Sequence, residues 1–290
     1  MNIVVIGATG MIGKPVTREL ISAGFNITLL VRNAQKARQL FTGVNILQGD
    51  VFNTDSLVAA FKGQDAVYIS LAPPHNGRPD HILPEREGID NIIAAAQQTG
   101  IRRIVLLSSL IQQYNNTNGF HWWVFDIKQA AVEKIKASGI PYTIFYPSTF
   151  MESIDQLMLQ GNRIMLAGRS LAPMHFIAGS DYGKQVAWSF RKLTTENREY
   201  NIQGPAAWNW DEASQRFIRC YTVRKLKIMK VPAAMLRWMG ALNTTIGYGA
   251  KISEALNNFS EQFVSETTWN ELGKPLITIE TYAEKLTRIQ

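Results

Sequence analysis

The chain has 290 residues, of which 46% are hydrophobic and 18% charged, and its net charge is +7. This composition excludes a disordered protein, and no apolar run approaches the ~20 residues of a membrane-spanning helix. The only cysteine, Cys220, excludes an internal disulfide bond and predicts a reducing, cytoplasmic location. The apolar N-terminus lacks a preceding basic region, so it is interpreted as a first strand rather than a signal peptide. The four histidines are scattered, which predicts no metal site.

The excess positive charge is compatible with an anionic ligand, a nucleic acid or an acidic membrane surface. Much of it lies in the run "RFIRCYTVRKLKIMK", residues 216–230. A solvated face is the first interpretation of this run, and a nucleic-acid or partner surface is the second. Because no helix-turn-helix or zinc-module pattern is present, we expect no nucleic-acid role, and we expect no insertion into a membrane.

Strand and helix patterns alternate strictly through the first half of the chain. Apolar, β-branched runs predict buried strands, and amphipathic segments between them predict helices. The six strand runs are "NIVVIG", "FNITLLVR", "VNILQGD", "DAVYISLAP", "IRRIVLLSS" and "PYTIFYPS". This order predicts an α/β fold with a doubly wound parallel sheet of the Rossmann type. We assign residues 1–150 to this domain.

The strict alternation of predicted strands and helices ends after Phe150. The segment "HFIAGSDYGKQVAWSFRKL" predicts a short strand and a helix that opens near Asp181, and "REYNIQGPAAW" predicts one more strand. The remainder is mostly helical in pattern. Residues 151–290 are therefore predicted to form a smaller, mostly helical C-terminal lobe, with segments that return to the edge of the sheet.

The first strand and first helix are joined by "GATGMIG", in which Gly7, Gly10 and Gly13 are evenly spaced. A side chain at Gly7 or Gly10 would keep a pyrophosphate away from the backbone N–H groups at the helix N-terminus. Gly13 would allow the helix to pack closely on the strand. An ordinary tight turn is the alternative, but the strand–turn–helix context favours a phosphate-binding turn that includes Thr9, Met11 and Ile12.

The ends of the next strands indicate which dinucleotide binds. An NAD site usually has a carboxylate at the end of the second strand, whereas Arg32 stands there. A guanidinium suits a 2′-phosphate, so NADP(H) is preferred, with NAD(H) as the alternative if Arg32 only stacks on adenine. Asp50 and Val51 are placed to contact adenine, although a turn aspartate is an equal interpretation. The segment "SLAPP", residues 70–74, is expected to line the cofactor cleft.

One lysine lies on the wrong side of a predicted helix. In "FHWWVFDIKQAAVEKIKASG" the apolar residues gather on one face, and Lys128 falls in the middle of that face. Either Lys128 faces the cleft or its side chain reaches past Phe125 and Val132 to solvent.

These segments together resemble a known family. "VIGATGMIGKPV", "QGDV", "RRIVLLSS" and "K…SGIPYTIFYPSTFME" are similar to the NmrA-like family of atypical short-chain dehydrogenases/reductases, which borders the isoflavone-reductase-like enzymes. The resemblance covers about the first 150 residues. Members have a Rossmann-type domain and a small C-terminal lobe, and they bind NADP or NAD. Some reduce quinones, enones or related molecules, and others are cofactor-sensing regulators.

The resemblance also assigns roles. Short-chain dehydrogenases carry Tyr-x-x-x-Lys on this helix, and here Lys128 matches the lysine while Val124 replaces the tyrosine. Lys128 is thus implied to bind the nicotinamide ribose and to act as proton donor or relay. Ser108 is implied to orient substrate, although a serine that only bonds backbone at the strand end is an equal interpretation. The cofactor-binding residues are then predicted to be Gly7, Thr9, Gly10, Met11, Ile12, Gly13, Arg32, Asp50, Val51, Leu71, Ala72, Pro73, Lys128, Tyr146, Pro147, Ser148 and Phe150.

Apolar and aromatic residues near the same sheet edge are candidates for a substrate pocket. We assign substrate contact to His75, Trp122, Trp123 and Met151, although the two tryptophans are equally compatible with a core and a loop histidine is more often a surface residue. The first hypothesis is an NADPH-dependent reductase of a quinone or enone. The alternative is a non-catalytic NADP(H)-binding redox sensor with a regulatory protein partner; an NAD-dependent epimerase or dehydratase is disfavoured by Val124 and Arg32. A monomer or homodimer is expected.

Overall fold

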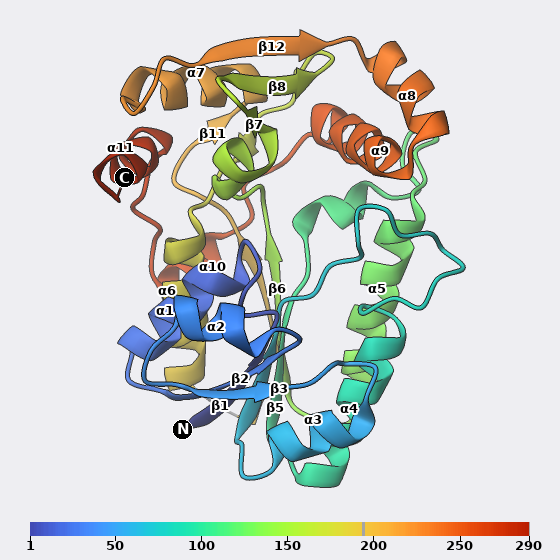
Figure 1. Cartoon of the computed structure of the whole chain (residues 1–290), viewed down its shortest axis with the longest axis vertical. Coiled ribbons are helices and arrows are strands. Elements are labelled where there is room, and N and C mark those ends of the chain that lie inside the picture. The colour runs from blue at the N-terminus through green and yellow to red at the C-terminus, as the bar shows by residue number, and fades with distance from the viewer. Residues whose placement is uncertain (193–194, 290) are drawn as a thin grey trace.

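A seven-stranded parallel sheet forms the centre of the protein, as seen in the computed structural model, which describes residues 1–192 and 195–289 (Figure 1). The strand order is β10-β6-β5-β4-β1-β2-β3. Its members are β1 (Asn2–Ile6), β2 (Asn26–Val31), β3 (Asn45–Gln48), β4 (Ala66–Ile69), β5 (Arg103–Leu107), β6 (Tyr142–Pro147) and β10 (Arg198–Ile202). The predicted Rossmann-type sheet is confirmed, and the strand expected in "REYNIQGPAAW" is its edge strand β10.

Helices cover both faces of this sheet. One face carries α1 (Gly13–Ser22), α2 (Ala34–Leu40) and α6 (Gly179–Arg191), and the other carries α3 (Thr54–Phe61), α4 (Glu87–Thr99) and α5 (Trp123–Ala137). Successive residues of a strand point to opposite faces. In β1, Ile3 and Val5 belong to one core, whereas Val4 and Ile6 belong to the other. Burial on both sides explains why the strands are continuous apolar runs.

The C-terminal lobe combines helices with two small sheets, which were not predicted apart from a short strand beginning at about His175. Its helices are α7 (Trp210–Cys220), α8 (Ala233–Leu242), α9 (Thr244–Asn258) and α11 (Ile279–Ile289). A three-stranded sheet is formed by β12 (Lys227–Val231), β8 (Arg163–Ala167) and β7 (Leu159–Gln160), and a pair by β11 (Ala207–Trp208) and β9 (Met174–His175). A separate core, which includes Phe176, Trp210 and Phe217, fills the lobe.

The chain crosses between the two parts several times after residue 150. It enters the lobe, returns as α6 against α1 and as β10 beside β6, and returns again as α10 (Glu266–Leu272), which packs on α6 and β10. Residues beyond 150 therefore contribute to both the lobe and the Rossmann-type part. No helix within residues 1–192 and 195–289 is both long and apolar enough to cross a bilayer.

Candidate functional site

The carboxyl ends of strands β1 to β6 surround a cavity of about 520 Å³. It lies where the strand order reverses between β1 and β4, which is the usual ligand position in open parallel sheets. The wall residues at the strand ends are Gly7, Arg32, Asp50, Ser70, Leu71, Ala72, Leu107, Ser108, Pro147, Ser148, Thr149 and Phe150. The opposite wall comes from α9 and the segment that follows it. Both parts of the molecule thus build one site.

The glycine turn packs more tightly than the sequence analysis assumed. Gly7 has a φ of 84°, and a Cβ on it would lie 2.0 Å from the carbonyl oxygen of Ser70 at the end of β4. A Cβ on Gly13 would lie 2.0 Å from the carbonyl oxygen of Gly7. The first constraint on Gly7 is therefore contact with the neighbouring strand rather than room for a phosphate. Gly10 is exposed and lines the cavity.

The N-terminus of α1 is open toward the cavity. Ile12 is the N-cap and provides no side-chain hydrogen bond, and the first turn of α1 contains no acidic residue. Gly10, Met11 and Ile12 all line the cavity. Because the N-terminal end of a helix dipole attracts negative charge, this arrangement fits a pyrophosphate group.

The adenosine end of the predicted cofactor site contains Arg32 and Asp50. Arg32 is exposed in the cavity wall directly after β2, and no ion pair involves it in the described part of the chain. Asp50 also lines the cavity, while its Oδ1 accepts a hydrogen bond from the backbone N–H of Phe52 at 3.0 Å. Asp50 therefore has the turn-forming contact that the sequence left open, and it also lies where an adenine contact is predicted. Val51 is buried beside it.

Lys128 points into the protein rather than to solvent. Its Nζ lies 2.7 Å from Oε1 of Glu85, and the two side chains are only 14% and 3% exposed. Burial raises the pKa of Glu85 above its ordinary value, while the positive charge of Lys128 opposes this shift. The second oxygen, Oε2, is buried without a hydrogen-bond partner in the described structure. Lys128 lines the cavity, so this ion pair holds an ammonium group at the site wall.

No phenol from α5 accompanies Lys128. Val124 is fully buried one turn before it. A phenol that interacts electrostatically with Glu85 is Tyr248 of α9, whose ring stacks on His75 with centroids 4.7 Å apart and meets Trp122 edge to face at 4.8 Å. Burial raises the pKa of Tyr248 well above its ordinary value, and the charge of Glu85 raises it further. Tyr248 does not line the cavity. Within the described residues, neither α5 nor α9 therefore places a tyrosine hydroxyl in the cavity wall with Lys128.

Of the remaining predicted cofactor and catalytic residues, Ser108 lines the cavity, whereas Pro73 and Tyr146 do not. Ser108 is buried in the cavity wall, where its Oγ donates to Oε1 of Gln112 at 3.3 Å. Pro73 is buried outside the lining. Tyr146 contributes to a different cavity, and its hydroxyl donates to Oε2 of Glu199 at 2.7 Å. Burial and the Glu199 charge raise the pKa of Tyr146 well above its ordinary value.

The four residues assigned to substrate contact lie outside this cavity lining. His75 is exposed and Trp122 is buried, and both meet Tyr248. Trp122 and Trp123 border another cavity, of about 600 Å³, which is also lined by residues 77–79 and by residues of α8 and α9. Met151 is 1% exposed in the core of the C-terminal lobe. Their role in substrate binding stays a prediction.

Sequence reasoning missed the wall that the C-terminal lobe supplies. Ile252, Leu256 and Phe259 face the cavity from α9 and its C-cap, and their spacing of four and three residues is a helical stripe. This apolar stripe in the sequence could have predicted a helix face that packs on the site. Glu261 follows, and its carboxylate accepts from the Ser148 hydroxyl and from the side-chain amide of Gln203, both at 2.6 Å. Nothing in the sequence around Glu85 or Glu261 indicated these long-range contacts.

Residues 7–163, more than half of the chain, match the family model described as NAD(P)H-binding. The photosystem II assembly factor Ycf39 of Guillardia theta is 27% identical over 300 residues, which cover 98% of this chain and 93% of that protein. Citrobacter sp. triphenylmethane reductase, solved with NADP(H), superposes with a TM-score of 0.77 at 21% identity, covering 99% of this chain and 100% of its own.

The NADPH-dependent quinone oxidoreductase QOR2 of Escherichia coli gives a TM-score of 0.75 at 19% identity, and the match covers 98% of this chain and 99% of that one. At such low identity these two structures show a shared fold. The expected NmrA-like, isoflavone-reductase-like resemblance is confirmed by the family match and the fold together. The chain therefore belongs to the family described as NAD(P)H-binding.

Proposed function

We propose that the protein is an NADPH-dependent reductase that transfers hydride to a small apolar acceptor such as a quinone or an enone. The bound nicotinamide would supply the hydride. The observation that carries this proposal is the Lys128–Glu85 ion pair, which holds a cation in the wall of a cavity at the sheet's switch point. Buried charges are costly, so a buried pair whose lysine lines a cavity favours a functional role over a structural one.

The proposed cofactor placement follows the cavity wall from one end to the other. The open N-terminus of α1 and the backbone at Gly10 would hold the pyrophosphate. Arg32 would pair with the 2′-phosphate, which makes NADPH the preferred form and NADH the alternative. Lys128 would bind the nicotinamide ribose, and Ser108, which lines the same cavity, would orient an acceptor. The relatives solved with NADP(H) or named for NADPH support this preference.

The acceptor is inferred from what the cavity wall contains. Ile252, Leu256 and Phe259 give the C-terminal side an apolar surface, which suits a flat hydrophobic molecule and excludes water. Since Val124 replaces the tyrosine acid, acceptors that need little help with protonation are favoured, and quinones meet that requirement. Lys128 is the proton donor or relay in this proposal. A cytoplasmic location, a regulatory partner and the oligomeric state stay predictions.

The test follows NADPH absorbance with a panel of quinones and enones. Lys128→Ala alone would leave Glu85 buried without its partner, at a cost of ~3–5 kcal/mol. The decisive variant is therefore Lys128→Met combined with Glu85→Gln, which removes both charges. We expect this variant to unfold at a temperature close to that of wild type and to lose about a hundredfold in kcat/KM.

Two outcomes would change the proposal. Undiminished turnover in the folded double variant would keep the reductase and remove Lys128 from its role. Tight NADPH binding by wild type without turnover of any acceptor would overturn the reductase and favour the redox sensor. Wild-type NADPH affinity, measured by fluorescence titration, distinguishes that case from simple loss of the cofactor site.

A further inference from the structure

Helix α8 has an apolar face that the described part of the chain leaves uncovered. None of its residues is buried. Ala234, Met235, Trp238, Ala241 and Leu242 recur at helical spacing and share an arc of roughly 120°. Met235, Trp238 and Leu242 are 47%, 70% and 78% exposed. Large apolar side chains concentrated on one helical face are unusual on a free surface and indicate an interaction site.

The opposite face of α8 contacts α9, which fixes where the apolar stripe points. A Cβ on Gly240 would lie 2.8 Å from Cα of Gly247, so α8 and α9 approach each other at their glycines. Figure 1 shows α8 beyond α9, at the end of the molecule that also carries β12. The stripe therefore faces away from α9 and from the protein core.

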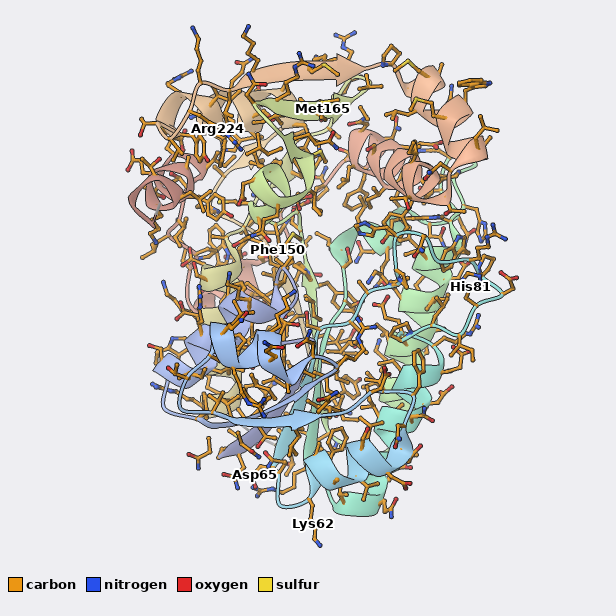
Figure 2. The ribbon with its side chains drawn as sticks, viewed as in Figure 1. Lys62, Asp65, His81, Phe150, Met165 and Arg224 are labelled. Atoms are coloured by element: carbon orange, nitrogen blue, oxygen red, sulfur yellow. The ribbon has the colours of Figure 1, made fainter. Side chains whose placement is uncertain are left out.

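Basic residues lie at the same end of the molecule as this stripe, in and before β12 and on α8 itself. Residues 213–253 contain eight lysines and arginines and no aspartate or glutamate, so this segment accounts for more than the whole net charge of the chain. Arg224, Lys225, Lys227 and Arg237 are exposed, and none of them has an ion pair within the described residues. Figure 2 labels Arg224 at this end of the molecule and Lys62 at the other end. We call these four residues and the stripe the β12–α8 surface.

The combination of charges and apolar side chains selects the partner. A second copy of the chain would place like charges opposite each other, which is costly. Nucleic acid would pair with the lysines and arginines but would leave Met235 and Leu242 without a matching surface. An anionic lipid bilayer matches both: phosphates for the cations, and an acyl boundary for a tryptophan–leucine–methionine stripe.

We infer that the β12–α8 surface docks the protein on an anionic membrane surface. α8 lies in the plane of the bilayer, with Trp238 and Leu242 about 5–10 Å deep at the headgroup boundary. The cations of β12 and of the loop before it contact lipid phosphates. The contact is peripheral, because the ten residues of α8 cannot span a bilayer. This inference does not depend on the proposed reductase activity, since its readout is binding to lipid.

The test is co-sedimentation of the full chain with vesicles. One set is phosphatidylcholine alone, and the other contains about one third phosphatidylglycerol. We expect binding to the anionic set only, weakened by added salt. Trp238→Ser with Leu242→Ser, and separately Lys225→Glu with Lys227→Glu, should each lower the partition coefficient roughly tenfold or more.

Matched controls distinguish binding by the β12–α8 surface from non-specific binding by other exposed residues. Ile82 and Leu276 are 68% and 78% exposed, close to Trp238 and Leu242, so Ile82→Ser with Leu276→Ser is the apolar control. Lys36→Glu with Lys62→Glu is the charge control. Both controls should bind as wild type does. Absence of wild-type binding to anionic vesicles, or equal loss in the controls, would overturn the proposal. So would binding to polyglutamate or RNA that depends on the lysines alone, without vesicle binding.

Discussion

At the scale of single residues, the pair formed by Lys128 and Glu85 shows how one lysine can occupy an apolar helical face. Nζ of Lys128 and Oε1 of Glu85 are 2.7 Å apart, and both side chains are largely buried. A buried ion pair often contributes no more stability than well-packed hydrophobic residues of the same volume. We therefore interpret the pair as a feature of the site. Glu85 positions Lys128, and its unpartnered Oε2 leaves that carboxylate only partly satisfied.

Arg32 allows the cofactor preference to be tested directly. We expect Arg32→Glu to weaken NADPH binding about 10- to 100-fold and NADH binding less than about threefold, because only NADPH carries the 2′-phosphate. Titration of both dinucleotides measures this. Arg38→Glu, an exposed change of the same charge outside the cavity lining on α2, should leave both affinities unchanged. Equal weakening of NADH and NADPH by Arg32→Glu would remove the NADP(H) assignment.

Glu152 makes stability depend on pH. Its carboxylate accepts hydrogen bonds from the backbone N–H of Gly179 at 2.9 and 3.0 Å, and burial raises its pKa from 4.5 to about 7. Between these two values the folded state binds more protons than the unfolded state. The free energy of unfolding therefore falls as pH rises from about 4.5 to about 7. Above pH 7 the folded protein bears the full cost of ionising the buried carboxyl group of Glu152.

Glu152→Gln keeps a side-chain acceptor for Gly179 and cannot ionise. We expect urea unfolding to show that the variant gains about 1–3 kcal/mol relative to wild type between pH 5 and pH 8. Glu133→Gln changes the charge equally on an exposed side chain and should show no such gain. If the wild-type slope persists in Glu152→Gln, another group is responsible for it.

At the scale of elements, the strands and helices of the Rossmann-type part were predictable from local sequence. Each strand is a continuous apolar run, and each helix has apolar residues at helical spacing. The strands "RIMLA" and "KIMKV" of the C-terminal sheet were not predictable, since each is partly exposed and paired with a segment distant in sequence. The same distinction applies to the site. Gly10, Arg32, Asp50 and Ser108 lie at strand ends, and a parallel sheet brings strand ends together regardless of side-chain detail.

The residues that were missed depend on contacts between remote segments. Glu85 stands in a loop without periodicity and meets Lys128 across 43 positions. Phe259 reaches the cavity only because α9 folds back over the sheet. His75 and Trp122 were expected near the cavity from their place in the chain, and the structure groups them around Tyr248 instead. Sequence proximity to a strand end did not specify on which side of α9 a loop residue would pack.

The glycine turn yields a prediction at this scale, because its glycines differ in how much space surrounds them. A Cβ at position 13 would collide with the carbonyl oxygen of Gly7 at 2.0 Å, whereas a Cβ at position 10 would meet the same atom at 3.2 Å. We expect Gly13→Ala to lower stability by about 2–4 kcal/mol, since backbone must move. Gly10→Ala should keep stability within about 1 kcal/mol of wild type yet weaken NADPH binding at least about tenfold.

Chemical unfolding and NADPH titration of the two variants provide the comparison. Each variant serves as the control for the other, because both add the same methyl group to the same turn. A Gly10→Ala variant that binds NADPH normally would place the phosphate elsewhere in the cavity. A Gly13→Ala variant with normal stability would show that the turn shifts at little cost.

At the scale of the whole molecule, the returning segments join the two parts into one folding unit. α6 covers α1, β10 extends the sheet beside β6, and the hydroxyl of buried Tyr182 in α6 lies 3.2 Å from that of Tyr68 in β4. We expect a fragment of residues 1–150 to expose the apolar faces of α1 and β6. Such a fragment should bind a hydrophobic dye and unfold without a sharp transition, whereas the full chain unfolds cooperatively. A fragment with a sharp transition would show that α6 and β10 are dispensable.

One structural feature links the two ends of the C-terminal lobe. Helix α9 presents Ile252 and Leu256 to the cavity and supports α8 through Gly247. It is thus a partition with a ligand site on one side and an outward-facing surface on the other. If contact at α8 shifts α9, the affinity of the cavity for its ligand changes by some factor, and thermodynamic reciprocity requires the ligand to change the outer contact by the same factor. Ligand binding in the cavity would then change the affinity of the outer surface for its partner, and the coupling would run through α9 rather than through the sheet.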